Sequence, residues 1–165
     1  MKCLIFVFAS IFSIAVWATE RNSLYTEQTN PEAYCLALNI YFEARGSSFA
    51  DKVAVSDVVL NRVKSSRFPN SVCEVIYQAH LAESGQPIRN QCQFSWFCDG
   101  KSDEPKEIDA WYESRVIAYQ ILHNGKFRGI TEGADHYHAT SVDPYWADGF
   151  QFVGIIGDHI FYRSN

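Results

Sequence analysis

Apolar and polar positions along the chain predict a central, buried helix in its first third. Within residues 34–44 only Asn39 and Glu43 are neither apolar nor aromatic, and a helix that is apolar nearly all round packs inside a protein. The Asn-Pro pair at 30–31 is a helix start, because Asn caps free amides and Pro fits the first helical position. Gly46 is the matching stop. The sequence therefore predicts a helix from about residue 31 that carries two isolated polar side chains into the interior.

Further helices follow from the same kind of pattern. A valine-rich segment over residues 50–64 has a broad apolar face at helical spacing. Ser71 followed by Glu74 is a capping box that opens a short helix over residues 71–77. A third long helix is predicted over residues 105–124, where Pro supplies the start and the following Gly the stop.

The C-terminal part of the chain changes to a period of two. Residues 136–138 read His-Tyr-His, so on a strand both imidazoles face one way and the tyrosine ring the other. Residues 150–162 form a hairpin pattern around a tight Gly-Asp turn, whereas residues 80–104 carry the least regular pattern. Helices therefore come first and a small antiparallel β-sheet comes last, at the C-terminal end. The predicted fold class is α+β, as one compact domain.

The first residues have the pattern of a secretory signal. Lys2 precedes an apolar run over residues 4–16, and small residues at the right positions favour cleavage after Ala18. The run is too short for a comfortable membrane span, although retention as an anchor is an alternative. The predicted organisation is a cleaved signal peptide over residues 1–18, a loose lead-in over 19–30, and a catalytic domain over 31–165. We expect the protein to be exported, to the periplasm or beyond, without stable membrane association after cleavage.

Composition narrows the choice of partners. Without the signal, 13 basic side chains stand against 19 acidic ones, a net charge of −6. No basic run or patch is present in the sequence, so nucleic acid is not expected as a partner. The remaining 147 residues are enough for one well-formed core, and we expect a monomer.

Cysteine usage agrees with export. Without Cys3, four cysteines remain, an even number suited to disulfides in an oxidising compartment. Four cysteines allow three pairings. Cys92 and Cys98 flank one aromatic loop and are close in sequence, so this pair is the economical choice and leaves Cys35 with Cys73. A zinc site is the rival, but none of the four forms a C-x-x-C pair.

Glu43 is the leading candidate for acid chemistry. It lies four residues after Asn39, on the same face of the predicted helix. Burial and the negative end of the helix dipole both raise the pKa of a carboxyl there, which suits a general acid near neutral pH. The alternative is a structural glutamate bonded to Arg45 or Arg62, because structural networks also shift pKa values.

Aromatic and histidine side chains supply candidates for a substrate groove. Three rings in the loop around residues 94–97 cannot all be buried by so short a segment, and flat rings suit stacking on sugars. His136 and His138 share one strand face, so one alternative is a catalytic zinc with Asp135, His159 or Glu43 as third ligand. The chain lacks an H-E-x-x-H motif, so no metal and no cofactor is predicted. The candidate groove residues are Asn39, Gln93, Phe94, Ser95, Trp96, His136, Tyr137 and His138.

Taken together, these segments resemble the cell-wall hydrolases of the SleB/CwlJ type, a family named for spore-cortex-lytic enzymes. The resemblance rests on several motifs that occur in one order along most of the chain after the signal. They are residues 40–46 (IYFEARG), 58–63 (VVLNRV), 93–96 (QFSW), 134–139 (ADHYHA) and 156–163 (IGDHIFYR). The family resemblance implies a compact lysozyme-like catalytic domain, peptidoglycan as substrate, and Glu43 as the catalytic acid.

The resemblance also shapes the expected reaction. The leading hypothesis is a lytic transglycosylase that cleaves the bond between N-acetylmuramic acid and N-acetylglucosamine, with Glu43 as general acid and then base. One alternative is a hydrolytic muramidase with a second acid, for which Asp57, Asp99 and Asp143 are available. Others are a zinc-dependent N-acetylmuramoyl amidase that uses His136 and His138, and a wall-binding module without catalysis.

Overall fold

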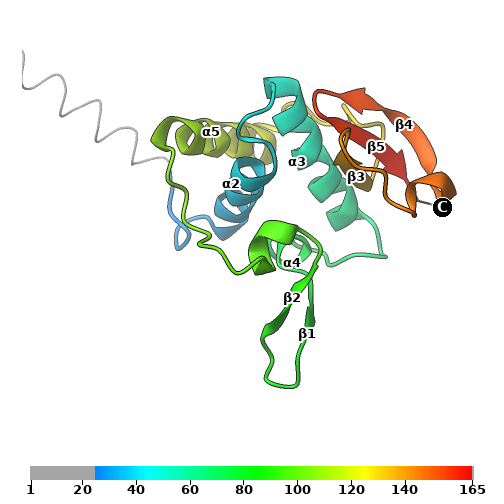
Figure 1. The fold of residues 1–165 in the computed structure, drawn as a ribbon. Helices are drawn as coiled ribbons and strands as arrows, with labels where there is room; N and C mark the ends of the chain where they lie inside the picture. The colour runs from blue at the N-terminus through cyan, green and yellow to red at the C-terminus, as the bar shows by residue number, and fades with distance from the viewer. Residues whose placement is uncertain (1–24, 165) are drawn as a thin grey trace, which may run out of the picture.

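The computed structural model of the chain describes residues 25–164, and the predicted signal peptide lies outside them. The α-helices all precede the three-stranded sheet at the C-terminal end, which confirms the predicted α+β class (Figure 1). The helices are α2 (Pro31–Ala44), α3 (Phe49–Lys64), α4 (Val72–Ile76) and α5 (Ile108–Asn124), with short 3₁₀ helices η1 (Ser95–Cys98) and η2 (Ala147–Gly149). The strands are β1 (Ala79–Leu81), β2 (Pro87–Cys92), β3 (His136–Ala139), β4 (Gln151–Ile156) and β5 (His159–Arg163).

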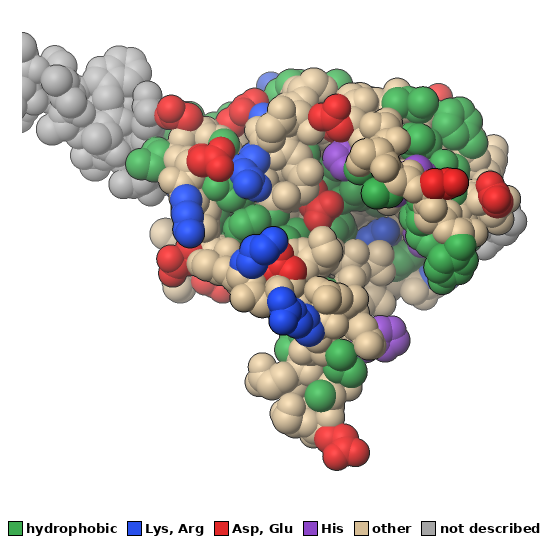
Figure 2. All heavy atoms as spheres, viewed as in Figure 1, with side chains coloured by type: hydrophobic (Ala, Val, Ile, Leu, Met, Phe, Trp, Pro, Cys, Tyr) green, Lys and Arg blue, Asp and Glu red, His purple; other side chains and the backbone are tan. Residues whose placement is uncertain are grey.

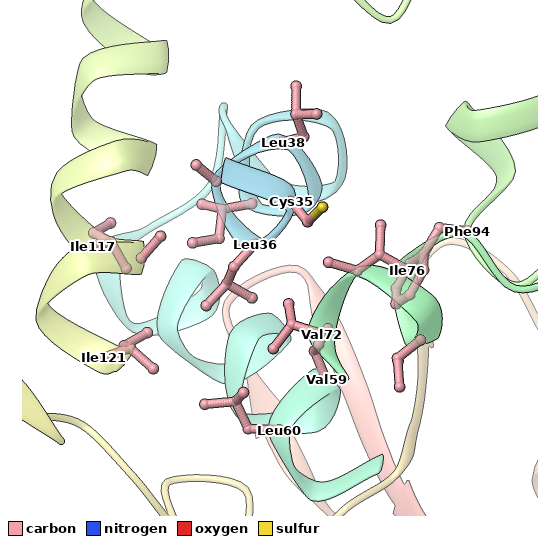
Figure 3. Packing of buried hydrophobic residues seen from close by; sticks show 14 of the residues in the cluster. Cys35, Leu36, Leu38, Val59, Leu60, Val72, Ile76, Phe94, Ile117 and Ile121 are labelled. Atoms are coloured by element: carbon pink, nitrogen blue, oxygen red, sulfur yellow. The ribbon is translucent and has the colours of Figure 1, made fainter. Parts of the chain in front are cut away.

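Helix α2 is the centre of the molecule, as its apolar pattern predicts. It contacts α3, α4 and α5, and Figure 3 shows buried side chains of all four helices meeting around it. Leu36 and Ile40 on α2 and Val59 on α3 are fully buried, and Ile117 on α5 is 1% exposed. Burying one such aliphatic side chain contributes about 1.5–3 kcal/mol, so this cluster holds α2 in place from three sides.

The predicted helix ends are close to those observed. Asn30 accepts a hydrogen bond from the backbone N–H of Ala33 at 3.2 Å, and Pro31 occupies the first turn of α2. Helix α5 begins at Ile108, three residues later than predicted. The backbone N–H groups of residues 106 and 107 instead donate to the hydroxyl of Tyr41, each at 3.1 Å.

The segment before α2 is more firmly attached than the predicted loose lead-in. Within its described part, residues 25–30, the Tyr25 side chain is buried. The Tyr25 hydroxyl donates to the backbone oxygens of Ala33 and Arg115. These bonds tie the segment to both α2 and α5.

Residues 79–92 form a hairpin that the sequence pattern does not predict. Strands β1 and β2 pair antiparallel and extend away from the helices (Figure 1). Their side chains are mostly polar and exposed, so the apolar alternation typical of a half-buried strand is missing. Gly85, with φ of +78°, lies in the connection, and Gly tolerates this left-handed conformation without strain.

The C-terminal strands form the predicted small antiparallel sheet, in the order β3-β5-β4. One face of the sheet covers α3, where Phe161 packs against Ala54, Val58 and Ala134. Tyr137 lies opposite Phe161, and His136 opposite Tyr162. The predicted Gly-Asp turn joins β4 to β5.

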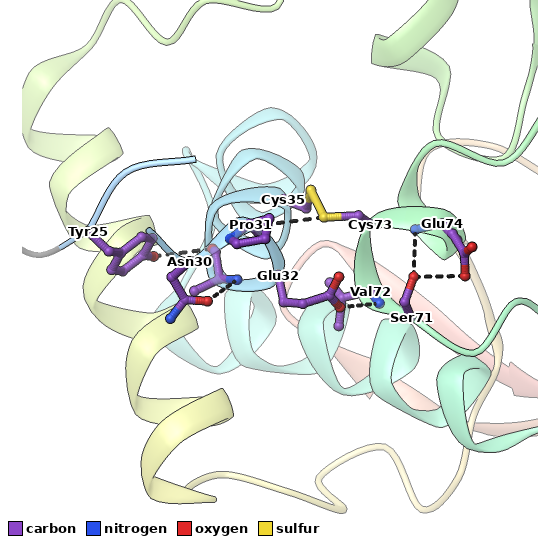
Figure 4. Close-up of a disulfide and its surroundings, with 10 residues drawn as sticks. Tyr25, Asn30, Pro31, Glu32, Cys35, Ser71, Val72, Cys73 and Glu74 are labelled. Carbon is purple, nitrogen blue, oxygen red and sulfur yellow. Dashed lines mark hydrogen bonds between the residues drawn. A yellow bond between two sulfur atoms is a disulfide. The ribbon is translucent and has the colours of Figure 1, made fainter. Parts of the chain in front are cut away.

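Both predicted disulfides are confirmed. Cys35–Cys73 joins α2 to α4, and Cys92–Cys98 joins the end of β2 to the end of η1. Figure 4 shows that the first bridge is supported by polar contacts between the same two helices. Glu32 accepts from the backbone N–H of Val72 at 2.5 Å. Within residues 25–164, no helix is both long and apolar enough to cross a membrane.

Candidate active site

The surface around Glu43 is hollowed into a pocket of about 530 Å³ between the C-terminal end of α2, η1 and the loop that follows it. Figure 2 shows this hollow, with acidic and basic side chains along its rim. The pocket residues are Tyr41, Phe42, Glu43, Arg45, Ser95, Trp96, Asp99, Lys101, Ser102, Asp103, Glu104, Lys106, Glu107, Ala139 and His159. Since most of them are polar, the pocket suits a hydrophilic ligand.

Glu43 lies in the last turn of α2 and is partly buried. Its Oε2 accepts a hydrogen bond from the Tyr137 hydroxyl at 3.1 Å. Burial raises the pKa of Glu43 above its ordinary value of 4.5, and the Tyr137 hydrogen bond and the nearby guanidinium of Arg62 oppose that rise only in part. The predicted direction of the shift and its main cause are therefore present in the structure.

The structural alternative for Glu43 is a bond to Arg45 or Arg62. Among the described residues, neither arginine forms an ion pair with Glu43. Arg45 pairs with Glu107 at 3.1 Å. The Arg62 Nε donates to the backbone oxygen of Asp135 at 2.7 Å. With its amide oxygen turned toward Arg62, Gln93 accepts two further bonds from that guanidinium, both 3.1 Å. Arg62 is thus a buried cation near Glu43 whose hydrogen bonds go elsewhere.

The two strand histidines are not in the Glu43 pocket, which corrects the expectation that they form its wall. Strand β3 turns Tyr137 toward α2 and α3, so His136 and His138 face the opposite side of the sheet. His136 Nδ1 bonds to Asp135, and His138 Nε2 bonds to the Tyr162 hydroxyl at 3.1 Å. The alternation was predicted correctly, but the residue that it places next to Glu43 is Tyr137 and not the histidines.

The aromatic loop contributes two of its four predicted groove residues. Ser95 and Trp96 line the pocket, and the Trp96 ring stacks on Phe42 with ring centres 4.9 Å apart. Phe94 is 3% exposed and packs in the core, and Gln93 faces Arg62.

Asn39, also predicted to bind substrate, is fully buried and outside the pocket lining. Its Oδ1 accepts from the Trp96 indole N–H at 3.1 Å. Asn39, one helical turn before Glu43 on the same face of α2, therefore fixes a pocket-lining ring.

The sequence reasoning missed the pairing of His159 with Asp51. His159 lines the pocket, and its Nδ1 lies 2.8 Å from Asp51 Oδ1 on α3. The position of His159 directly after the predicted turn, on the same strand face as Phe161, is the signal that could have placed it.

Other acids also reach the pocket. Asp99 and Asp103 line it from the loop after η1, and burial together with the charge of Asp99 raises the pKa of Asp103. Asp57 does not: it accepts from residues 128–131 on the far side of α3. Among the residues that the structure describes, no group of three or more His, Cys, Asp or Glu side chains is placed to hold a metal ion.

These observations define the class of protein: a small α+β domain with a glutamic acid of raised pKa at the end of its central helix, in an open polar pocket. Residues 46–162 match the family described as Cell Wall Hydrolase. The chain belongs to that family. The matched segment begins three residues after Glu43, so it covers the pocket residues from η1 onward but not the acid.

Individual relatives agree with the family. The chain is 44% identical to the spore cortex-lytic enzyme of Bacillus subtilis over 50 residues, which are 30% of this chain and 16% of that enzyme. It is 46% identical to the spore cortex-lytic enzyme of Bacillus cereus over 43 residues, 26% of this chain and 17% of the enzyme. The matched segments thus span about a sixth of the length of these relatives.

Two solved structures share the fold. The catalytic domain of the germination-specific lytic transglycosylase SleB from Bacillus anthracis matches with a TM-score of 0.59 and 26% identity, over 86% of this chain and 98% of that one. The catalytic domain of the Bacillus cereus SleB protein matches with a TM-score of 0.57 and 23% identity, with the same coverage.

Proposed function

We propose that this protein cleaves the glycan strands of peptidoglycan as a lytic transglycosylase, with Glu43 as the only proton-transferring residue. The observation that carries the proposal is the raised pKa of Glu43 in a pocket lined by polar and aromatic side chains. Family membership and the similarity to a lytic transglycosylase domain support it.

The proposed reaction cleaves the bond between N-acetylmuramic acid and N-acetylglucosamine in two steps. In the first, protonated Glu43 gives its proton to the glycosidic oxygen, which leaves C1 with the bonding electron pair. The carbonyl oxygen of the substrate's 2-acetamido group bonds to C1 and forms an oxazolinium ring. In the second, the muramoyl 6-hydroxyl attacks C1, its proton returns to the Glu43 carboxylate, and the amide is restored. The product is a 1,6-anhydro ring, and Glu43 is regenerated.

The environment of Glu43 suits both steps. Its raised pKa keeps the proton available near neutral pH. The Tyr137 hydroxyl donates to Oε2 and stabilises the carboxylate that forms after the first transfer. The Phe42 ring, partly exposed and stacked on the buried Trp96 ring beside the acid, offers a flat surface for a sugar face. We further propose that the protein is exported and acts as a monomer.

A hydrolytic muramidase is the second candidate, because Asp99 and Asp103 also line the pocket. Glycosidases that hydrolyse with two carboxylic acids use one as acid and the other as base or nucleophile. The two reactions differ in their products, since only the transglycosylase makes 1,6-anhydro-muramic ends.

Mass spectrometry of muropeptides after digestion of purified peptidoglycan tests the proposal. We expect anhydro-muramic ends from the wild-type protein and no cleavage by Glu43→Gln. Products with reducing muramic ends would instead support the hydrolytic muramidase and reject the transglycosylase. A fully active Glu43→Gln would reject Glu43 as the acid.

A further inference from the structure

Asp51 and His159 form a buried pair where α3 meets the turn between β4 and β5. The Asp51 side chain is fully buried. Its Oδ1 bonds to His159 Nδ1 at 2.8 Å, and its Oδ2 accepts from the backbone N–H of Asp158 at 3.0 Å. Burial would raise the pKa of Asp51, but the hydrogen bonds from His159 and Asp158 bring it below its ordinary value. Asp51 is therefore a carboxylate that accepts from both partners.

The close approach of the turn to Asp51 requires a glycine at position 157. A Cβ atom there would lie 2.6 Å from Asp51 Oδ2, a distance that side chains do not tolerate. Gly157 also has φ of +58°, which favours glycine. The turn reaches Asp51 closely enough to donate a hydrogen bond because this position carries no side chain.

The pair fixes how His159 presents its second nitrogen. An ionised carboxylate only accepts, so the bond to Asp51 requires the ring proton on Nδ1. In the neutral ring, Nε2 is then an acceptor. This atom makes no hydrogen bond to the described part of the chain, and His159 lines the pocket with Glu43. The edge-on Tyr137 ring, 5.1 Å away between centres, packs against the imidazole and limits its rotation.

We propose that Asp51 is a positioning residue that holds His159 in this tautomer, and that His159 Nε2 accepts a hydrogen bond from the N–H of the substrate's 2-acetamido group. The inference rests on the proposed function. In the first step the acetamido oxygen bonds to C1 and its nitrogen gains positive charge, while the N–H proton stays on nitrogen. The N–H becomes a stronger donor as the oxazolinium forms, so the contact to Nε2 strengthens in the transition state, as catalysis requires. A second carboxylate thereby assists the reaction through a histidine.

Asp51→Asn tests the tautomer directly. An asparagine has one acceptor and one donor where the carboxylate has two acceptors. The backbone N–H of Asp158 can only donate, so the Asn oxygen faces it and the Asn NH₂ faces His159 Nδ1. The ring must then carry its proton on Nε2, which turns the pocket-facing acceptor into a donor, the kind of change that a buried Asp prevents in other catalytic sites.

Asp57→Asn is the matched control. Asp57 is equally buried on the same helix and accepts from Gly129, Thr131 and Arg128. It lies outside the pocket lining. This variant therefore reports the effect of replacing a buried, multiply bonded aspartate of α3 without changing His159.

The experiment measures kcat and KM on purified glycan strands and ¹⁵N NMR of the labelled imidazoles. For Asp51→Asn we expect a proton on Nε2, a kcat lower by about 10²-fold and a nearly unchanged KM. Asp57→Asn should stay within about threefold of wild type in each, since it removes no proposed transition-state contact. His159→Gln, which leaves Asp51 in place, should also lower kcat with little change in KM.

Several results would overturn the inference. They are a wild-type kcat in Asp51→Asn, a wild-type proton on Nδ1 of that variant, or a wild-type kcat in His159→Gln. A failure of the proposed function appears elsewhere, as reducing ends in the wild-type products, and can be told apart from these outcomes.

Discussion

Replacing Glu43 by Gln should make the folded protein more stable than wild type as pH rises. Gln keeps the size of the side chain and an oxygen that can accept from the Tyr137 hydroxyl, which is 3.1 Å from Oε2 in the wild-type protein. It cannot ionise, so it removes the cost of a charge in a site where burial disfavours one.

The sign and size follow from linkage. Because the folded-state pKa of Glu43 is raised above the ordinary 4.5, the stabilisation from its protonated form is fully present below pH 4.5. It is lost as pH rises through the raised pKa. In that window the wild type should lose stability relative to Glu43→Gln by about 1.4 kcal/mol per pH unit. Above the folded-state pKa the difference should become constant.

Urea unfolding of both proteins at half-unit steps from pH 3.5 to 8.5 measures this difference. The same samples are assayed for wall digestion, where the loss of a general acid is worth about 10²–10⁴-fold. A difference in unfolding free energy that does not change with pH would refute a raised pKa at Glu43. A difference that falls with rising pH would show that the folded-state pKa is depressed.

Four further outcomes are expected. Tyr137→Phe removes a hydrogen bond that lowers the pKa of Glu43, so the basic limb of the pH–activity profile should move to higher pH; an unchanged limb would contradict this. Gly157→Ala should displace the Asp51 carboxylate and reduce both thermal stability and kcat, measured by calorimetry and by digestion. Loss of the Cys35–Cys73 bridge, whose cysteines have a sequence separation of 38, should cost about 4 kcal/mol in the chain-entropy view, measured by urea unfolding of the double Ser variant. Activity should survive thorough chelation, and a loss that zinc restores would favour the amidase alternative.

Local signals in the sequence were sufficient for the helices and disulfides. The Asn30–Pro31 start needs only the geometry of a free helix end, and the run of apolar residues in α2 can be satisfied only by burial on several sides. Cys92 and Cys98 are close enough along the chain for their pairing to follow from proximity. The hairpin over residues 79–92 was missed because exposed polar strands carry no apolar alternation.

The site depended on information that no local pattern contains. Alternation along residues 136–138 separates the tyrosine from the histidines, but it does not say which set faces the interior. That choice is made by α3, whose small side chains accept Phe161, so that Tyr137 on the neighbouring strand must share its face. Once Tyr137 faces inward, its hydroxyl reaches Glu43 and its ring packs on His159. The pairing of His159 with Asp51 spans 108 residues and requires a glycine in the intervening turn. The placement of the sheet on α3 thus explains why His136 and His138 lie outside the pocket and why His159 lines it.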